Sequence, residues 1–242
     1  MNKKTTQRFP ELVFVGIDGV LVRFGAEVTE QINQAALTFH RHVSASVPAG
    51  VLESAASLTA VFLRLDIEGN MGAALQWIEQ QIASQDWFVS QSSNGRHWII
   101  PCCFDGPQLG EAAALAGISE QKAIAQITAV TTHVLTLGFA PGQPYLGSLE
   151  PHWDIPRMDG IAPNVPAQAL VVALRQLIIF NNTAPTGWRH IGQTAFRCFD
   201  KDRPEPFALQ AGDAVRFEQA GRAEIDALLK APFGGAKFEV TS

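Results

Sequence analysis

Residues 138–147 read Gly-Phe-Ala-Pro-Gly-Gln-Pro-Tyr-Leu-Gly, with three glycines and two prolines. Glycine reaches positive φ at little cost and proline locks φ near the value that turns need. We therefore predict a rigid loop that is neither helix nor strand. Phe139 and Tyr145 flank this loop, which predicts a partly apolar surface with a phenol at its edge. Such a surface is typical of the wall of a ligand pocket.

The composition is that of an ordinary globular protein. The chain has 242 residues, 47% of them apolar, enough for one large domain or two small ones. Its net charge is −5 and its 18 Lys and Arg residues form no run. We therefore expect protein and small-molecule partners, and neither nucleic acid nor a membrane surface. The polar start and the lack of an apolar run of ~18 residues predict a cytoplasmic protein.

Three cysteines, at positions 102, 103 and 198, favour neither a disulfide framework nor a zinc site. Cys102 and Cys103 are neighbours, so in a strand their side chains point to opposite faces. We expect all three to be buried apolar residues, and we predict no metal site in this chain.

The first part of the chain predicts a small α+β domain. Apolar runs at 12–15 and 20–24 flank a glycine-rich turn and predict a hairpin. Apolar residues then recur at helical spacing from Thr29, a predicted N-cap, to Val43. A central strand at 58–65 and a second helix at 71–82 follow, which predicts helices on one face of a sheet.

The second part of the chain predicts mostly strands. The polar segment Ser90–Gly95 is the most linker-like stretch, so we place one domain at 1–93 and the other at 94–242. Ser119 is a predicted N-cap for a helix to about Thr128. A short helix is predicted at 111–115, and strands at 97–104, 134–137, 170–180, 194–200, 214–218 and 238–241. Strands joined by Gly, Pro and Asn turns are typical of a barrel.

Several motifs, taken in order, resemble one known family. They are residues 138–147, Pro156-Arg157, Val165-Pro166-Ala167 and the Pro-x-Gly-Trp-x-x-Ile-Gly-x-Thr block at 185–194, together with 21–25, Ile100-Pro101 and 212–217. The chain thereby resembles the family of the 5-oxoprolinase B subunit (PxpB), which also covers KipI and allophanate hydrolase subunit 1. The resemblance implies an α+β fold, with a small N-terminal α/β sandwich followed by a cyclophilin-like β-barrel.

Four residues are the candidates for binding a ligand. Arg157 follows a proline and offers a planar guanidinium to a carboxylate or phosphate, or else forms a surface salt bridge. Trp188 either stacks on a planar ligand or packs in the core. Tyr145 offers a hydroxyl to a ligand or to the fold, and Gln176 is an amide in an apolar run that needs a ligand or backbone partner.

The segment 175–181 departs from the family pattern. Family members typically carry Gly-Gln-Thr-Gly-Ile-Tyr-Pro where this chain has Arg-Gln-Leu-Ile-Ile-Phe-Asn. Arg175 and Ile178 add side chains where glycine lets a ligand approach the backbone, and Leu177 removes a hydroxyl. We expect an altered or closed site.

The leading hypothesis is the PxpB-type subunit of a heteromeric, ATP-dependent 5-oxoprolinase-like amidohydrolase. The resemblance implies that the assembled complex opens 5-oxoproline, a lactam, to glutamate and uses ATP together with PxpA-like and PxpC-like partners. We identify no catalytic residue, because the six histidines form no triad by sequence and no nucleotide-binding loop motif occurs. The alternatives are a non-catalytic, KipI-like inhibitor of a sensor histidine kinase or a binding scaffold, and, more weakly, a peptidyl-prolyl isomerase.

Overall fold

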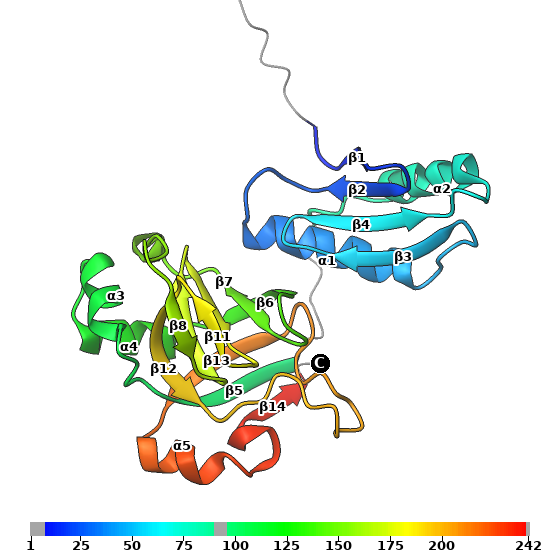
Figure 1. The fold of residues 1–242 in the computed structure, drawn as a ribbon. Coiled ribbons are helices and arrows are strands. Elements are labelled where there is room, and N and C mark those ends of the chain that lie inside the picture. The colour runs from blue at the N-terminus through cyan, green and yellow to red at the C-terminus, as the bar shows by residue number, and fades with distance from the viewer. Residues whose placement is uncertain (1–7, 90–95, 241–242) are drawn as a thin grey trace, which may run out of the picture. The chain divides into compact units, whose positions relative to one another are not determined.

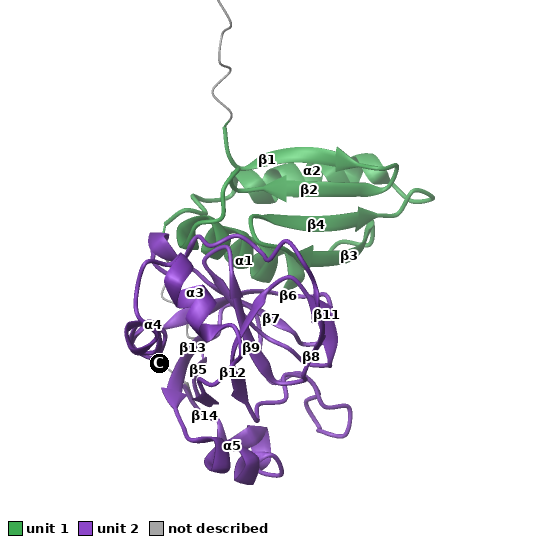
Figure 2. Cartoon of the chain, turned by 60° about the vertical axis from the view of Figure 1, so that its left-hand side comes forward, with its two compact units in different colours: residues 1–92 green, residues 93–242 purple. Residues whose placement is uncertain are grey.

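The computed structural model describes residues 8–89 and 96–240. The chain divides into two compact units, residues 1–92 and 93–242 (Figure 2). The predicted linker at Ser90–Gly95 lies outside the described residues, as does Thr241, the last residue of the predicted strand at 238–241. The predicted boundary between residues 93 and 94 therefore stays a prediction.

Unit 1 is an antiparallel sheet with two helices. Its elements are β1 (Glu11–Val15), β2 (Gly19–Arg23), α1 (Glu30–Ser44), β3 (Val51–Ala56), β4 (Ala60–Leu65) and α2 (Met71–Ala83), and its strand order is β1-β2-β4-β3 (Figure 1). Thr29 caps α1 as predicted, because its hydroxyl accepts from the amide of Ile32 at 3.2 Å. The predicted hairpin, the two helices and the central strand are present. Edge strand β3 was not predicted, and only one of its six residues, Val51, is buried.

Unit 2 is built on a closed β-barrel. Its eight-stranded sheet contains β5 (Arg96–Cys103), β6 (Thr132–Leu137), β7 (Pro144–Gly147), β9 (Ala169–Ala173), β10 (Gln176–Ile179), β12 (Arg189–Thr194), β13 (Ala214–Gln219) and β14 (Lys237–Val240). The strand order is β12-β9-β10-β7-β6-β13-β5-β14, and β12 also pairs with β5. That last pairing closes the ring, and β14 joins the other half of β5. The predicted α+β class with a β-barrel in the second part is confirmed.

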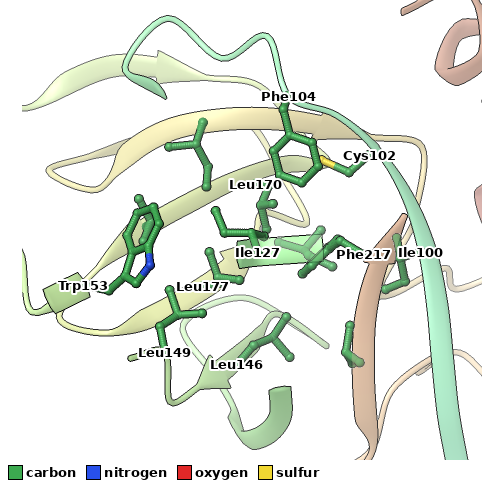
Figure 3. Close-up of a cluster of buried hydrophobic side chains, with 14 of the residues drawn as sticks. Ile100, Cys102, Phe104, Ile127, Leu146, Leu149, Trp153, Leu170, Leu177 and Phe217 are labelled. Carbon is green, nitrogen blue, oxygen red and sulfur yellow. The ribbon is translucent and has the colours of Figure 1, made fainter. Parts of the chain in front are cut away.

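The barrel interior is a continuous apolar core. Inward side chains of Ile100, Leu146, Leu170, Leu177 and Phe217 meet there (Figure 3). Helices α3 (Leu109–Leu115) and α4 (Glu120–Ala129) add buried side chains to the same core, and Ser119 caps α4 as predicted. A further helix, α5 (Arg222–Leu228), packs near β5 and was not predicted.

Three predicted segments of unit 2 differ from the structure. Residues 170–180 form two strands, because Leu174 and Arg175 turn the chain at φ values of 51° and 62°. The predicted loop at 138–147 is a loop only at its start, and its last four residues form β7. The predicted strand at 194–200 is wrong as well, because β12 ends at Thr194. A prediction based on apolar content could identify neither the turn at Leu174 nor strand β12, which is rich in polar residues.

A two-stranded ribbon completes unit 2. Strands β8 (Ala162–Val165) and β11 (Ala184–Thr186) pair with each other in antiparallel fashion, separately from the barrel sheet. Each contains a proline, Pro163 or Pro185, which is typical of edge positions and hides a strand from sequence patterns. The ribbon was not predicted, and it forms one wall of the site described next.

Candidate binding cavity on the outer face of the barrel

The side chains of β10 point alternately into the barrel and outward, and the outward ones form part of the candidate site. Leu177 and Ile179 enter the barrel core, whereas Ile178 and Phe180 point outward. Ile178 lies opposite Tyr145 of β7, so both side chains belong to the outer face. This face forms its own apolar cluster with Trp188 and with Val165 of the ribbon. The ribbon and Trp188 therefore cover this part of the outer surface of the barrel.

A cavity of about 260 Å³ lies in this region, and we call it the outer cavity. The 138–147 loop, the 157–161 segment and the turn after β11 form its walls, and β10 forms its floor. The residues that line it are Phe139, Gln143, Tyr145, Arg157, Ile161, Ile178, Phe180, Pro185, Thr186, Gly187 and Trp188. Three of the four residues predicted to bind a ligand, Tyr145, Arg157 and Trp188, meet here.

Trp188 is the centre of this group. Its ring lies 5.5 Å from the guanidinium carbon of Arg157, a cation–π contact, and 6.2 Å from the ring of Tyr145, edge to face. Trp188 is buried, whereas Arg157 is exposed. Within residues 8–89 and 96–240, neither the Arg157 guanidinium nor the Tyr145 hydroxyl has a hydrogen-bond partner. Both groups are thus available to a ligand.

The segment that carries Arg157 is held at both ends. The amide of Met158 donates to the carbonyl oxygen of Gly187 at 2.7 Å, and the buried Arg189 donates to the carbonyl oxygen of Pro156. A second nitrogen of Arg189 donates to Glu111 of α3 at 2.9 Å. These bonds fix the backbone around Arg157, while its side chain stays free to meet an anion.

Gln143 is a site residue that sequence reasoning missed. It is only 2% exposed and lines the outer cavity. Its backbone N–H and C=O bond to Ala140 and Gly138, but in the described part of the chain its side-chain amide has no hydrogen-bond partner. The Gln143 amide is not among the fully buried side-chain groups that lack a partner in the described chain, so it keeps some contact with solvent. The signal for finding it was present, since it is the one amide in an otherwise apolar loop.

The backbone next to Gln143 requires glycine. Gly142 has a φ of +70°, and a Cβ there would lie 2.9 Å from the carbonyl oxygen of Cys198. Phe139 also has a positive φ, 69°, although it carries a side chain. The positive φ that glycine was predicted to supply in this loop occurs at Gly142, and Phe139 adopts one as well.

Gln176 does not line the cavity. It shares the outward face of β10 with Ile178, but it lies over Gly147, where a Cβ would be 3.5 Å from its Cγ. Arg175 lies at the β9–β10 turn, and its Nε donates to the carbonyl oxygen of Leu149 at 2.8 Å. Arg175 therefore does not close the site, whereas Ile178 does put its side chain into the lining.

A polar cluster around Asp105 lies elsewhere on the barrel, and none of its residues lines the outer cavity. Asp105 forms an ion pair with Arg222, and burial together with Asp105 raises the pKa of the neighbouring Cys103 thiol. Burial lowers the pKa of His190 below its ordinary value. A protonated thiol is a poor nucleophile. Over residues 8–89 and 96–240, no group of three or more His, Cys, Asp or Glu side chains is placed to hold a metal ion.

Comparison with known proteins identifies similar chains. A family model described as carboxyltransferase domain, subdomain C and D, matches residues 10–209. The chain is 27% identical over 229 residues to the 5-oxoprolinase B subunit of Bacillus subtilis strain 168, covering 88% of this chain and 94% of that one. It is 39% identical over 112 residues to the 5-oxoprolinase B subunit of Escherichia coli O157:H7, covering 46% of this chain and 51% of that one.

A solved structure shares the fold. The crystal structure of TTHA0988 matches with a TM-score of 0.73 at 31% identity, over 84% of this chain and 40% of that chain. This chain thus spans less than half of the length of that solved chain. Among the helices that the structure describes, none has the length and apolar character needed to cross a bilayer.

Proposed function

This chain belongs to the family of the carboxyltransferase domain, subdomain C and D, and we propose on that basis that it is the PxpB-type subunit of an ATP-dependent 5-oxoprolinase-like amidohydrolase. In this proposal the outer cavity binds 5-oxoproline, and partner proteins complete the enzyme. The names of the B. subtilis and E. coli relatives support the proposal. The observation that carries it is the guanidinium of Arg157 beside Trp188, which has no hydrogen-bond or ion-pair partner among the described residues.

Arg157 is suited to the carboxylate of this substrate. A guanidinium presents parallel N–H donors that match the two oxygens of a carboxylate. The backbone on both sides of Arg157 is hydrogen-bonded, so little backbone entropy is lost when the side chain engages an anion. The Trp188 ring makes a cation–π contact with this guanidinium at 5.5 Å. A cavity of about 260 Å³ is at the small end of ligand sites, which fits a single five-membered ring.

Gln143 and Tyr145 supply the polar groups for the lactam. A side-chain amide can donate to the lactam oxygen and accept from the lactam N–H. Gln143 and Tyr145 both line the outer cavity, so in this proposal the Gln143 amide and the Tyr145 hydroxyl contact the lactam. In this proposal Gln143 replaces Gln176, which the sequence analysis named as a candidate for binding a ligand. Trp188 and Ile178 then contact the apolar methylene face of the ring.

The reaction needs groups beyond this cavity. Opening the lactam adds water across the C–N bond, so that the carbonyl carbon becomes the side-chain carboxylate of glutamate and the nitrogen becomes its amino group. An unstrained amide carbonyl needs activation, here by phosphorylation of its oxygen at the expense of ATP. We assign ATP use to the assembled complex, with PxpA-like and PxpC-like partners, in the cytoplasm. Phe139 and Ile161, which are 78% and 70% exposed at the cavity rim, are the apolar residues that a partner would cover.

Two measurements test this function. The first is calorimetric binding of 5-oxoproline to the isolated chain. Arg157→Gln is expected to weaken binding about tenfold or more. Gln176→Leu is the matched control, because Gln176 shares the outward face of β10 but lies outside the cavity. The affinity of this variant for 5-oxoproline should be unchanged.

The second measurement is ATP-dependent release of glutamate from 5-oxoproline by the chain co-expressed with candidate partners. An assembled complex that releases no glutamate would remove the enzyme proposal.

One observation favours a second candidate function. The cavity floor carries Ile178 and Phe180, which have no polar group, and the rim exposes Phe139 and Ile161. Apolar surfaces of this kind suit a protein ligand, as in a non-catalytic inhibitor of a sensor histidine kinase. The test is suppression of kinase autophosphorylation by the isolated chain. Ile161→Asp should abolish suppression in that case, whereas Leu52→Asp, at an exposed position of unit 1, should not.

A further inference from the structure

Unit 2 contains a second cavity, of about 580 Å³, which shares no lining residue with the outer cavity. It lies between the segment 197–205, which follows β12, and the segment 229–234, which follows α5. We propose that it binds a small organic carboxylate with an apolar body. This volume is within the range of sites for small organic ligands. The proposal does not depend on the function proposed for the outer cavity.

The apolar part of this cavity comes from Pro204, Leu229, Pro232 and Phe233. Phe233 has a positive φ of 50°, and the next residue, Gly234, has a φ of +60°. A Cβ on Gly234 would overlap the carbonyl group of Ala195, so this turn lies directly against the barrel backbone. The wall that carries Phe233 is therefore set by the fold before any ligand binds.

The charged part of the cavity has a surplus of cations. Arg197, Arg203 and Lys230 line it, against the carboxylates of Asp200 and Glu205. Three cations against two carboxylates leave one positive charge. The ion pair between Arg197 and Asp200 is long, at 3.8 Å. Lys230 forms no ion pair within the described ranges.

Arg203 is the residue that favours a carboxylate. Its Nη2 donates to the carbonyl oxygen of Pro206 at 2.8 Å, and its guanidinium carbon lies 5.0 Å from the ring centroid of Phe233. Its Nε is buried and has no hydrogen-bond partner in the part of the chain that the structure describes. The guanidinium is thus held in place but only partly used, next to an aromatic wall. A carboxylate in the cavity would face this cation while its apolar body contacts Pro232 and Leu229.

The two acidic residues do not cancel this preference. Asp200 already accepts from the backbone amide of Asp202 at 3.1 Å as well as facing Arg197. Glu205 is exposed, so water screens its charge. A phosphate or sulfate would meet the same cations but would gain nothing from the apolar wall. The mixed lining therefore favours an aromatic or branched aliphatic carboxylate over an inorganic anion.

The test uses benzoate as the probe and the full-length chain. Amide chemical shifts of isotope-labelled protein are followed during titration with benzoate, with benzamide as its uncharged analogue, and with inorganic phosphate. Benzoate should shift the amides of 197–205 and 229–234. Benzamide and phosphate should each bind at least about tenfold more weakly. Absence of benzoate binding, shifts confined to other regions, or equal binding of benzamide or phosphate would each overturn the proposal.

Substitutions of Arg203 and Lys230 test which cation binds the carboxylate of benzoate. Arg203→Gln should weaken benzoate binding at least about tenfold, and Lys230→Gln about threefold, since Lys230 is exposed. Arg41→Gln, an exposed change in unit 1, should leave the affinity unchanged. If Arg203→Gln fails to fold, as judged by its thermal unfolding, Lys230→Gln decides the question. Unchanged affinity in whichever of these two variants is folded would contradict the proposal.

Discussion

Arg189 donates a hydrogen bond to the carbonyl oxygen of Pro156, the residue directly before Arg157. Arg189 is only 4% exposed, and it also donates to Glu111 at 2.9 Å. One buried side chain therefore connects β12, α3 and the segment that presents Arg157. We conclude that Arg189 positions Arg157 without touching the cavity itself.

Replacing Arg189 should loosen this connection. Arg189→Met removes both hydrogen bonds and leaves the Pro156 carbonyl without its donor, so we expect the free energy of unfolding to fall by about 1–3 kcal/mol. The affinity for 5-oxoproline should fall as well, because Arg157 loses its fixed backbone. Urea unfolding and calorimetry measure the two effects. Arg64→Met is the control, since the Arg64–Glu53 pair is exposed and should contribute at most about 1 kcal/mol. Equal losses in the two variants would contradict the assignment.

Replacing Gln143 should weaken ligand binding without lowering the stability of the fold. Gln143→Leu replaces a side-chain amide that lacks a hydrogen-bond partner in the described chain by an apolar group of similar size. We expect the free energy of unfolding to stay the same or to rise by about 1 kcal/mol, while affinity for 5-oxoproline falls about tenfold or more. Denaturant unfolding and calorimetry give the two numbers. A clear loss of stability would mean that the amide serves the fold and not a ligand.

Two glycines of the same loop should respond in opposite directions. Gly142→Ala puts a methyl group 2.9 Å from the Cys198 carbonyl at a φ of +70°, so we expect a loss of about 1–3 kcal/mol. Gly138 has open space around its Cβ position and no positive φ. Gly138→Ala should therefore be neutral or stabilise by up to about 1 kcal/mol. Thermal unfolding of both variants provides the comparison, and similar effects would show that the loop is not rigid at Gly142.

The three thiols should be unreactive in the folded chain. Burial raises the pKa of Cys198 to about 12, and burial also raises the pKa values of Cys102 and Cys103. A raised pKa means that the thiol stays protonated near neutral pH, and the thiolate is the reactive form. Ellman's reagent at about pH 8 should therefore titrate no thiol in the native protein and all three after unfolding in urea. Fast reaction of one native thiol would contradict this.

Features that depend on local chemistry were predicted well. Thr29 and Ser119 cap their helices as expected, because a side-chain hydroxyl satisfies amides only a few residues away. The hairpin at the start of the chain and the strand-rich second half are also confirmed. Prediction failed at Leu174 and Arg175, where residues with ordinary side chains form a turn at positive φ. No residue type there indicates a turn, so a continuous apolar run was interpreted as one strand.

The candidate site was likewise predicted in part from local sequence and completed only by the tertiary structure. The amino-acid sequence was sufficient to determine the fold class and the family, and it named Tyr145, Arg157 and Trp188 as separate candidates, since these follow from composition, motifs and turn chemistry within short segments. The tertiary structure decided that these three side chains line one cavity. The choice of Gln143 over Gln176 came only from the tertiary structure. Both are amides beside apolar residues, and what distinguishes them is which part of the outer face the β8–β11 ribbon covers. That cover is made by segments distant in the chain, whose pairing no local pattern encodes.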